Sequence, residues 1–204
     1  KRNSKDTKVT DMLYACYDLA ENGKKFDAEM KAIKARYQEI IDGLSLDLSL
    51  EDEFVKIAEN FKNKAGKDYA ASRGEYLNGI IMAKYLGFAF VDAAEVIVFD
   101  DNGEFASEET NEKLKKRFEK CDSAVVPGFY GAYRDGRVKT FSRGGSDITG
   151  SIVARAIMAN VYETCNSILT AEEKNEIKEL VIKVFEYYRP LMYGHEENHV
   201  FNNH

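Results

Sequence analysis

The sequence predicts a layered α/β fold. Apolar residues recur at helical spacing in several long segments, and most of these segments are bounded by a glycine or by a residue that caps helices. Short runs rich in valine, phenylalanine and alanine lie between the later segments and end at turn sequences, as buried strands do. Alternation of strands with helices is typical of layered α/β proteins, which is why we expect this class.

The first part of the chain is predicted to be helical. Helices are expected at residues 10–20, 27–42, 54–61 and 73–86. Gly43 ends the second of these helices and Gly87 the fourth, because glycine readily adopts the left-handed conformation that closes a helix. Ser72 is expected to cap the fourth helix, and with Glu75 it has the spacing of a capping box. The segment 44–50 is interpreted as a linker.

Strands are predicted only in the later part of the chain. One or two buried strands are expected within 88–100, and further short strands at 123–127 and 137–141. The turn sequences Asp101–Gly103 and Asp135-Gly136 separate them from their neighbours.

Further helices are expected at 107–121, 152–161 and 170–188. Ser107 is expected to cap the first, while Thr170 and Glu173 form a capping box at the start of the last. Pro190 is expected to end that last helix. The last helix is strongly amphipathic, so its apolar face either covers the domain or forms a dimer.

Composition argues against several classes of protein. The chain has 204 residues, of which 44% are hydrophobic and 31% charged, which suits one domain with a packed core. A net charge of −6 argues against binding to nucleic acid or to an acidic membrane. No apolar run approaches the roughly 20 residues of a membrane span, and no apolar segment of a secretion signal follows the basic N-terminus. We therefore expect a cytoplasmic protein without nucleic-acid or membrane partners.

The sequence predicts neither disulfides nor a metal site. Cys16, Cys121 and Cys165 are odd in number and widely spaced, so we expect three mostly buried thiols. The stretch His195–His199 matches the zinc motif H-E-x-x-H, but Pro190 precedes it and no apolar helix surrounds it. We expect a solvated tail there instead.

The stretch FSRGGSDITG carries the clearest sign of a binding site. It lies between a predicted strand and a predicted helix, where unpaired amide groups and the helix dipole favour anions. Gly144 and Gly145 permit close approach of the backbone to a ligand, and Arg143 offers a planar fork that matches a carboxylate. Ser146 either caps the helix or donates to a ligand oxygen, and Asp147 suits the first turn in both cases. The alternative is a plain glycine turn with the arginine in solvent.

Two other stretches point to the same region. PGFYG begins at Pro127 and follows another strand end, although a plain β-turn explains it equally well. Ser72-Arg73-Gly74-Glu75 opens a predicted helix, where a capping box is the alternative. Ligands of open α/β sheets bind beyond the carboxyl ends of strands, and both glycine turns lie at such ends.

Together these stretches closely resemble the catalytic domain of aspartokinases, in the amino acid kinase superfamily. The resemblance is carried by SRGEYLNGIIMAKYLGFAFVDAAEVI (72–97) and VVPGFYGAYRDGRVKTFSRGGSDITGSIVARA (125–156), and more loosely by KRNSKDTKVTDMLY at the start. It implies a three-layer αβα domain over residues 1–163, with a mostly parallel central sheet that is incomplete at the N-terminus. Residues 164–204 resemble nothing in the family and are expected to form a helical extension.

The resemblance also implies a role for individual residues. Arg143 would clamp a carboxylate of L-aspartate, Glu75 would pair with its ammonium group, and Asp147 would lie near the transferring phosphoryl group. The other positions implied are Thr10, Phe129, Gly144 and Ser146 around the amino acid, and Gly128 and Gly145 around the cofactor ATP.

The activity implied is transfer of a phosphoryl group from ATP, with Mg²⁺, to the side-chain carboxylate of aspartate. The product, 4-phospho-L-aspartate, serves lysine, threonine and methionine biosynthesis, and a homodimer is one expectation. The family's Lys-Phe-Gly-Gly-Ser loop is not found, since Lys25-Phe26 is followed by Asp27, and the chain lacks the tryptophan of its nucleotide-binding segment. The alternative is therefore a non-catalytic module that binds aspartate or mediates oligomerisation.

Overall fold

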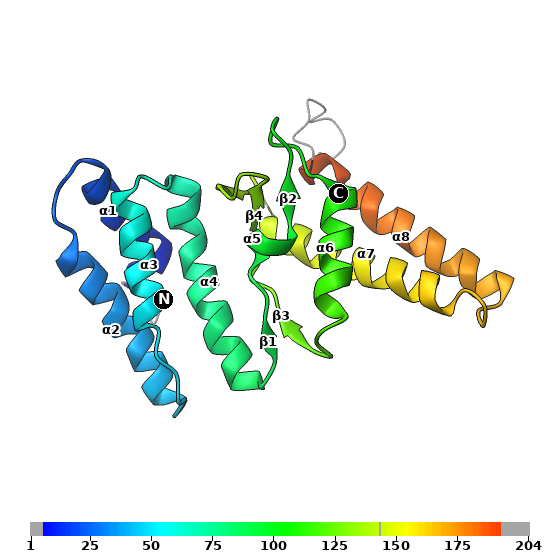
Figure 1. Cartoon of the computed structure of the whole chain (residues 1–204), viewed down its shortest axis with the longest axis horizontal. Coiled ribbons are helices and arrows are strands. Elements are labelled where there is room, and N and C mark those ends of the chain that lie inside the picture. The colour runs from blue at the N-terminus through cyan, green and yellow to red at the C-terminus, as the bar shows by residue number, and fades with distance from the viewer. Residues whose placement is uncertain (1–5, 143, 193–204) are drawn as a thin grey trace.

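The computed structural model describes residues 6–142 and 144–192 (Figure 1). The elements, in chain order, are α1 (Val9–Glu21), α2 (Asp27–Gly43), α3 (Glu51–Lys62), α4 (Lys67–Leu86), β1 (Ala89–Phe90), α5 (Ala93–Val96), β2 (Val98–Phe99), α6 (Ser107–Phe118), β3 (Ala124–Val125), β4 (Tyr130–Tyr133), β5 (Val138–Thr140), α7 (Gly145–Cys165) and α8 (Ala171–Met192). The α/β class is confirmed, with helices α1 to α4 preceding the strands.

The strands lie between two helical layers, as Figure 1 shows. Helix α4 packs against β1, β3 and β5, whereas α6 packs against β2 and α7 against β4. The predicted central sheet takes the form of two short sheets among the described residues: β1 pairs in parallel with β3, and β4 lies between β2, in parallel, and β5, antiparallel. The carboxyl ends of β3 and β5 lead into the two glycine turns.

The helices α1 to α4 share one hydrophobic core. Their predicted apolar stripes converge on fully buried side chains such as Leu13, Ile33 and Phe61. Tyr17 packs edge-on against Phe61, with 5.5 Å between ring centroids. Burial of these large side chains, rather than helix propensity, contributes most of the stability of these helices.

A second core lies under the strands. It joins Ile97 and Phe99 beside β4 to Ile148 and Ile152 of α7, all of them buried. Tyr76 of α4 packs against both cores, so this helix links them.

Helix α4 begins earlier than expected, which overturns the capping role of Ser72. Gly66 is the residue that precedes the helix, so Ser72 and Glu75 lie inside it and form no capping box. Ser72 is fully buried, and its hydroxyl donates to the carbonyl of Tyr69 at 2.8 Å. Serine in a helix interior often bonds back to the preceding turn in this way. The predicted end at Gly87, in the left-handed conformation, is confirmed.

The other helix boundaries also differ in places. Helix α7 starts at Gly145, directly after the glycine turn, rather than at residue 152. Ser107 is the first residue of α6 and not its cap; its hydroxyl accepts a hydrogen bond from Arg155 instead. Helix α8 runs through Pro190 to Met192, because a proline in a last turn removes only one hydrogen bond.

The predicted capping box at the start of α8 is confirmed. The backbone N–H of Glu173 donates to the Thr170 hydroxyl at 3.2 Å, and the N–H of Thr170 donates to the Glu173 carboxylate at 2.8 Å. None of the helices in the described part of the chain is long and apolar enough to cross a membrane.

Candidate functional site

The turn that leads into β4 lies in direct backbone contact with the first turn of α7. A Cβ atom on Gly128 would lie 2.9 Å from the Cα atom of Ser146, and one on Gly145 would lie 2.6 Å from the Cβ atom of Phe129. Carbon atoms do not approach one another this closely, so both positions require glycine. The two glycine turns that the sequence places at strand ends therefore meet in one place.

Phe129 is held in a left-handed backbone conformation within this contact. Its φ is 69°, which costs a bulky residue on the order of 1–3 kcal/mol. Its N–H donates to the hydroxyl of Thr149 on α7 at 3.0 Å, and its carbonyl accepts from the N–H of Phe141 at 2.9 Å. Such backbone strain, fixed by surrounding hydrogen bonds, is concentrated at functional sites.

The start of α7 offers hydrogen-bond donors toward solvent. Gly144 precedes the helix with a φ of 58°, and no side chain of the described residues caps it. Capping by Ser146 is therefore wrong, and the side chains of Ser146 and Asp147 are exposed on the first turn. Because first-turn amides lack intrahelical partners and carry the positive end of the helix dipole, this helix start suits an anion.

Thr10 and Glu75 lie on helices that touch at Gly74. A Cβ atom on Gly74 would lie 3.7 Å from side-chain carbons of both Val9 and Leu13, so α1 and α4 are in contact there. Thr10 is half-buried and Glu75 is exposed. Thr10 follows Val9 and Glu75 follows Gly74, so both predicted site residues lie beside this contact between α1 and α4.

Tyr37 of α2 also contacts α4 at Gly74. Its hydroxyl donates to the carbonyl of Gly74 at 2.9 Å. Burial raises the pKa of Tyr37 well above its ordinary value, and the negative charge of Glu75 raises it further. Tyr37 therefore stays a neutral hydrogen-bond donor beside Glu75.

Helix α4 connects the contact at Gly74 with the meeting of the two glycine turns. A Cβ atom on Gly79 would lie 3.4 Å from Pro127, at the start of the turn before β4. Asp68 accepts hydrogen bonds from the N–H of Thr140 at 3.2 Å and from its hydroxyl at 3.0 Å, so α4 also holds the end of β5. Sequence reasoning missed Asp68, because it expected this helix to begin at residue 73 and left Asp68 in the polar segment before it.

Two sequence predictions fall outside the described residues. Arg143 is one of them, although Ser142 and Gly144 on either side are described. The H-E-x-x-H match at 195–199 is the other. Within 6–142 and 144–192, no group of three His, Cys, Asp or Glu side chains could hold a metal ion.

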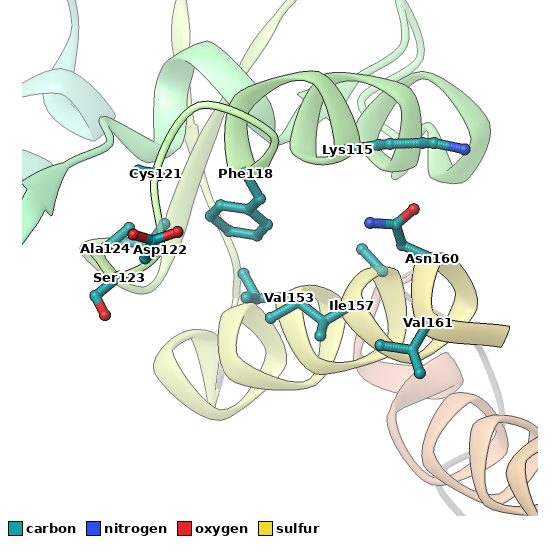
Figure 2. Close-up of a pocket in the computed structure, with 12 residues that line it drawn as sticks. Lys115, Phe118, Cys121, Asp122, Ser123, Ala124, Val153, Ile157, Asn160 and Val161 are labelled. Atoms are coloured by element: carbon teal, nitrogen blue, oxygen red, sulfur yellow. The ribbon is translucent and has the colours of Figure 1, made fainter. Parts of the chain in front are cut away.

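Two pockets of the described structure lie away from the glycine turns. One, of about 310 Å³, lies between α6 and α7, where Phe118 faces Val153 and Ile157 (Figure 2). Lys115 lines it and forms an ion pair with Glu163 at 2.7 Å. Another, of about 300 Å³, lies against α2 and α3. None of the predicted site residues lines either of these two pockets.

Comparison with known proteins identifies the family. The model of the amino acid kinase family matches residues 7–179. Aspartokinase 3 of Bacillus subtilis is 34% identical over 185 residues, which cover 82% of this chain and 40% of that protein. The aspartokinase of Rickettsia felis is 26% identical over 168 residues, covering 74% of this chain and 42% of that protein. The chain thus spans about two fifths of the length of these relatives.

Solved structures agree with this assignment. The aspartate kinase of Clostridium acetobutylicum superimposes with a TM-score of 0.73 at 51% identity, covering 77% of this chain and 36% of that chain. E. coli aspartokinase III, in complex with aspartate and ADP, has a TM-score of 0.58 at 22% identity, covering 74% and 38%, which supports the fold alone. Because the family model matches most of its length, the chain belongs to the amino acid kinase family, as an aspartokinase-like member.

Proposed function

We propose that this chain supplies the aspartate-binding part of an aspartate kinase. The reaction is attack by an oxygen of the aspartate side-chain carboxylate on the γ-phosphorus of ATP, which forms 4-phospho-L-aspartate and releases ADP. One observation carries the proposal: the backbone contact of Gly128 and Phe129 with Gly145 and Ser146. This contact places the exposed, uncapped start of α7 beside a strained turn, a suitable setting for an anionic substrate.

The two charged ends of the amino acid call for different partners. Arg143 is proposed to bind a carboxylate bidentately, and the exposed Glu75 to pair with the ammonium group. Thr10, next to the contact of α1 with Gly74, lies within the same group of helices as Glu75. Phe129 is proposed to form the apolar wall of the pocket.

The start of α7 is proposed to hold the reacting groups. Gly144, Gly145 and Ser146 offer backbone N–H groups and a hydroxyl to oxygen atoms that carry negative charge in the transition state. Gly128 leaves room for this approach. Asp147 is proposed to lie next to the transferring phosphoryl group, where its carboxylate orients a cationic partner.

ATP and Mg²⁺ fit these residues in part. The uncapped helix start suits a phosphate, and the exposed Asp147 carboxylate is the kind of ligand that Mg²⁺ takes together with phosphate oxygens. When bound, Mg²⁺ supplies charge neutralisation on the transferring phosphate. The role in lysine, threonine and methionine biosynthesis, and a place in the cytoplasm, follow from the same proposal.

A second function is supported by a specific feature of the sequence. The chain contains no Lys-Phe-Gly-Gly-Ser stretch, and Gly144-Gly145 is its one pair of adjacent glycines. A chain that binds aspartate without phosphorylating it would retain the acceptor site and lack a lysine to neutralise the phosphate. This non-catalytic aspartate-binding module is the alternative.

Calorimetric titration with L-aspartate, followed by a hydroxylamine trap, separates these functions. We expect saturable binding of L-aspartate that Arg143→Ala weakens at least tenfold without lowering the melting temperature. Arg137→Ala is the matched control, because Arg137 is an exposed arginine of the neighbouring hairpin, paired with Asp135. Hydroxamate that requires both L-aspartate and MgATP would establish the kinase. Binding without hydroxamate would favour the module, and no binding would refute both.

A further inference from the structure

Arg73 is a buried arginine enclosed by tyrosine rings. Only 4% of its surface is exposed. Its guanidinium carbon lies 4.3 Å from the ring centroid of Tyr76, 4.5 Å from that of Tyr69 and 5.4 Å from that of Tyr130. All three distances are within the range of cation–π attraction, which strengthens when the cation is removed from water. We call these four residues the tyrosine cage.

The charge of Arg73 has no direct ion-pair partner among the described residues. Its Nε and Nη2 atoms donate instead to the hydroxyl of Ser72, at 3.1 and 2.9 Å. A buried cation without a carboxylate is costly unless its surroundings are arranged around it. The burial of an arginine here therefore points to a role beyond packing.

The carboxylates near the cage act through its tyrosines. The hydroxyl of Tyr76 donates to Glu53 at 2.7 Å, and that of Tyr130 donates to Asp92 at 2.6 Å. Each hydroxyl that donates to a carboxylate draws negative charge toward the cage. Asp92 also accepts from the N–H of Ala94, so the Tyr130 partner is itself fixed at the start of α5.

The cage joins the two parts of the proposed site. Tyr69 and Tyr76 belong to α4, and Tyr76 directly follows Glu75 in the chain. Tyr130 is the first residue of β4 and directly follows Phe129. Arg73 therefore links α4, which carries Glu75, to the turn that carries Phe129.

We propose that Arg73 is a positioning residue that fixes the turn at 127–130 relative to α4, and so sets the separation of Glu75 and Phe129. The expected effect on aspartate binding rests on the proposed function, whereas the expected effect on the turn rests on the geometry of the cage alone. We expect lysine to be a poor substitute for Arg73. A planar guanidinium stacks on the rings and donates two hydrogen bonds to the Ser72 hydroxyl, whereas an ammonium is a compact point charge.

Hydrogen exchange of the whole chain, measured by mass spectrometry, tests this role. In Arg73→Lys we expect peptides that cover 127–133 to exchange at least tenfold faster, with peptides of α2 and α3 unchanged. Calorimetry should show L-aspartate binding at least tenfold weaker. Arg155→Lys is the matched control: Arg155 bonds to Ser107 and Asn111 between α7 and α6, and its variant should change neither readout.

Each outcome decides the proposal. Wild-type exchange at 127–133 in Arg73→Lys, or faster exchange spread evenly over all helices, would overturn it. Should Arg73→Lys not fold, Tyr69→Leu removes one ring of the cage and should give the same pattern with a smaller change. Should the wild-type chain bind no L-aspartate, the proposed function fails, and the exchange pattern alone decides the role of Arg73.

Discussion

At the residue scale, the environment of each glycine decides what it contributes. Gly145 and Gly150 both lie in α7, yet a Cβ atom on Gly145 would collide with Phe129, whereas one on Gly150 would meet nothing within 4 Å. The first glycine is required by the contact between the turns. Gly150 makes no such contact, and its backbone loses more conformational entropy on folding than that of alanine.

Alanine at these two positions should have opposite effects. Gly145→Ala should destabilise the chain by about 1–3 kcal/mol, because the turn must move to admit the methyl group. Gly150→Ala should be neutral or stabilise by up to about 1 kcal/mol through helix propensity. Urea unfolding followed by circular dichroism measures both. Equal effects of the two substitutions would contradict the close contact of the turns.

Strain and burial at single residues also mark the site. Phe129 keeps a left-handed φ although it is not glycine, and Arg73 keeps a charge in a nearly closed environment. Both features carry a cost that ordinary packing residues avoid. They lie on adjacent elements of the same proposed site, connected by Tyr130.

At the element scale, α4 contacts several parts of the proposed site, and the start of α8 is stabilised by a capping box. Helix α4 holds the end of β5 through Asp68, the turn before β4 through Gly79, and α1 through Gly74. Helix α8 packs against α7, and its start is closed by the Thr170–Glu173 capping box.

The capping box predicts how the start of α8 responds to acid. Hydrogen bonds from the N–H and hydroxyl of Thr170 hold the pKa of Glu173 below its ordinary value of 4.5. A lowered pKa in the folded state means that the stabilisation is present above about pH 4.5 and is lost as the pH falls through the lowered value. Amide chemical shifts of residues 171–174 should therefore move toward unfolded values only once the pH falls below the ordinary pKa of a glutamate.

Two variants test this response. Thr170→Ala should raise amide exchange in the first turn of α8 roughly fivefold at neutral pH, as loss of a helix cap does. Glu173→Gln keeps an acceptor for the Thr170 N–H and removes the ionisable group, so it should abolish the acid dependence. An unchanged acid response in Glu173→Gln would assign the effect to another carboxylate.

At the scale of the whole molecule, two cores share one helix. Leu77 and Ile81 of α4 belong to the core of α1 to α4, while Tyr76 packs against both cores and lies edge-on to Phe90 of β1, with 5.3 Å between ring centroids. Loss of either core would expose one face of α4. We therefore expect the two cores to unfold together. Association into a homodimer stays a prediction.

Cys16 reports on this coupling. It is fully buried in the core of α1 to α4, and burial, helped by the charges of Glu29 and Asp27, raises its pKa to about 12. Only about one thiol in ten thousand would then be ionised at pH 8, so alkylation should require unfolding. The half-buried Cys121 and Cys165 should react first in the native protein.

Alkylation of Cys16 in increasing urea should follow the same transition as circular dichroism. Mass spectrometry of peptides assigns the modified thiol at each urea concentration. Modification of Cys16 at urea concentrations where circular dichroism is still native would show that the core of α1 to α4 opens alone. That result would contradict the linkage through α4.

The sequence by itself determined most of the long helices, the two glycine turns and the family resemblance, but not α5, within a stretch predicted to be strand, or β4. Apolar spacing and capping residues are local signals, so α1, α2, α3 and the capping box at Thr170 were predicted closely. The resemblance of the glycine stretches to aspartokinases was equally visible, because it rests on consecutive residues. Boundaries failed where tertiary contacts extended a helix, as at Ser72 inside α4 and Gly145 at the start of α7.

Only the tertiary structure decided which side chains meet. The close contact of Gly145 with Phe129, the hydrogen bonds of Asp68 with Thr140 and the tyrosine cage around Arg73 all join residues that are distant in the chain or on different elements. No local pattern encodes such contacts: an arginine at a helix position is normally solvated, and its burial depends on what the rest of the chain packs around it. Local interactions thus specify the elements, whereas close packing specifies the site.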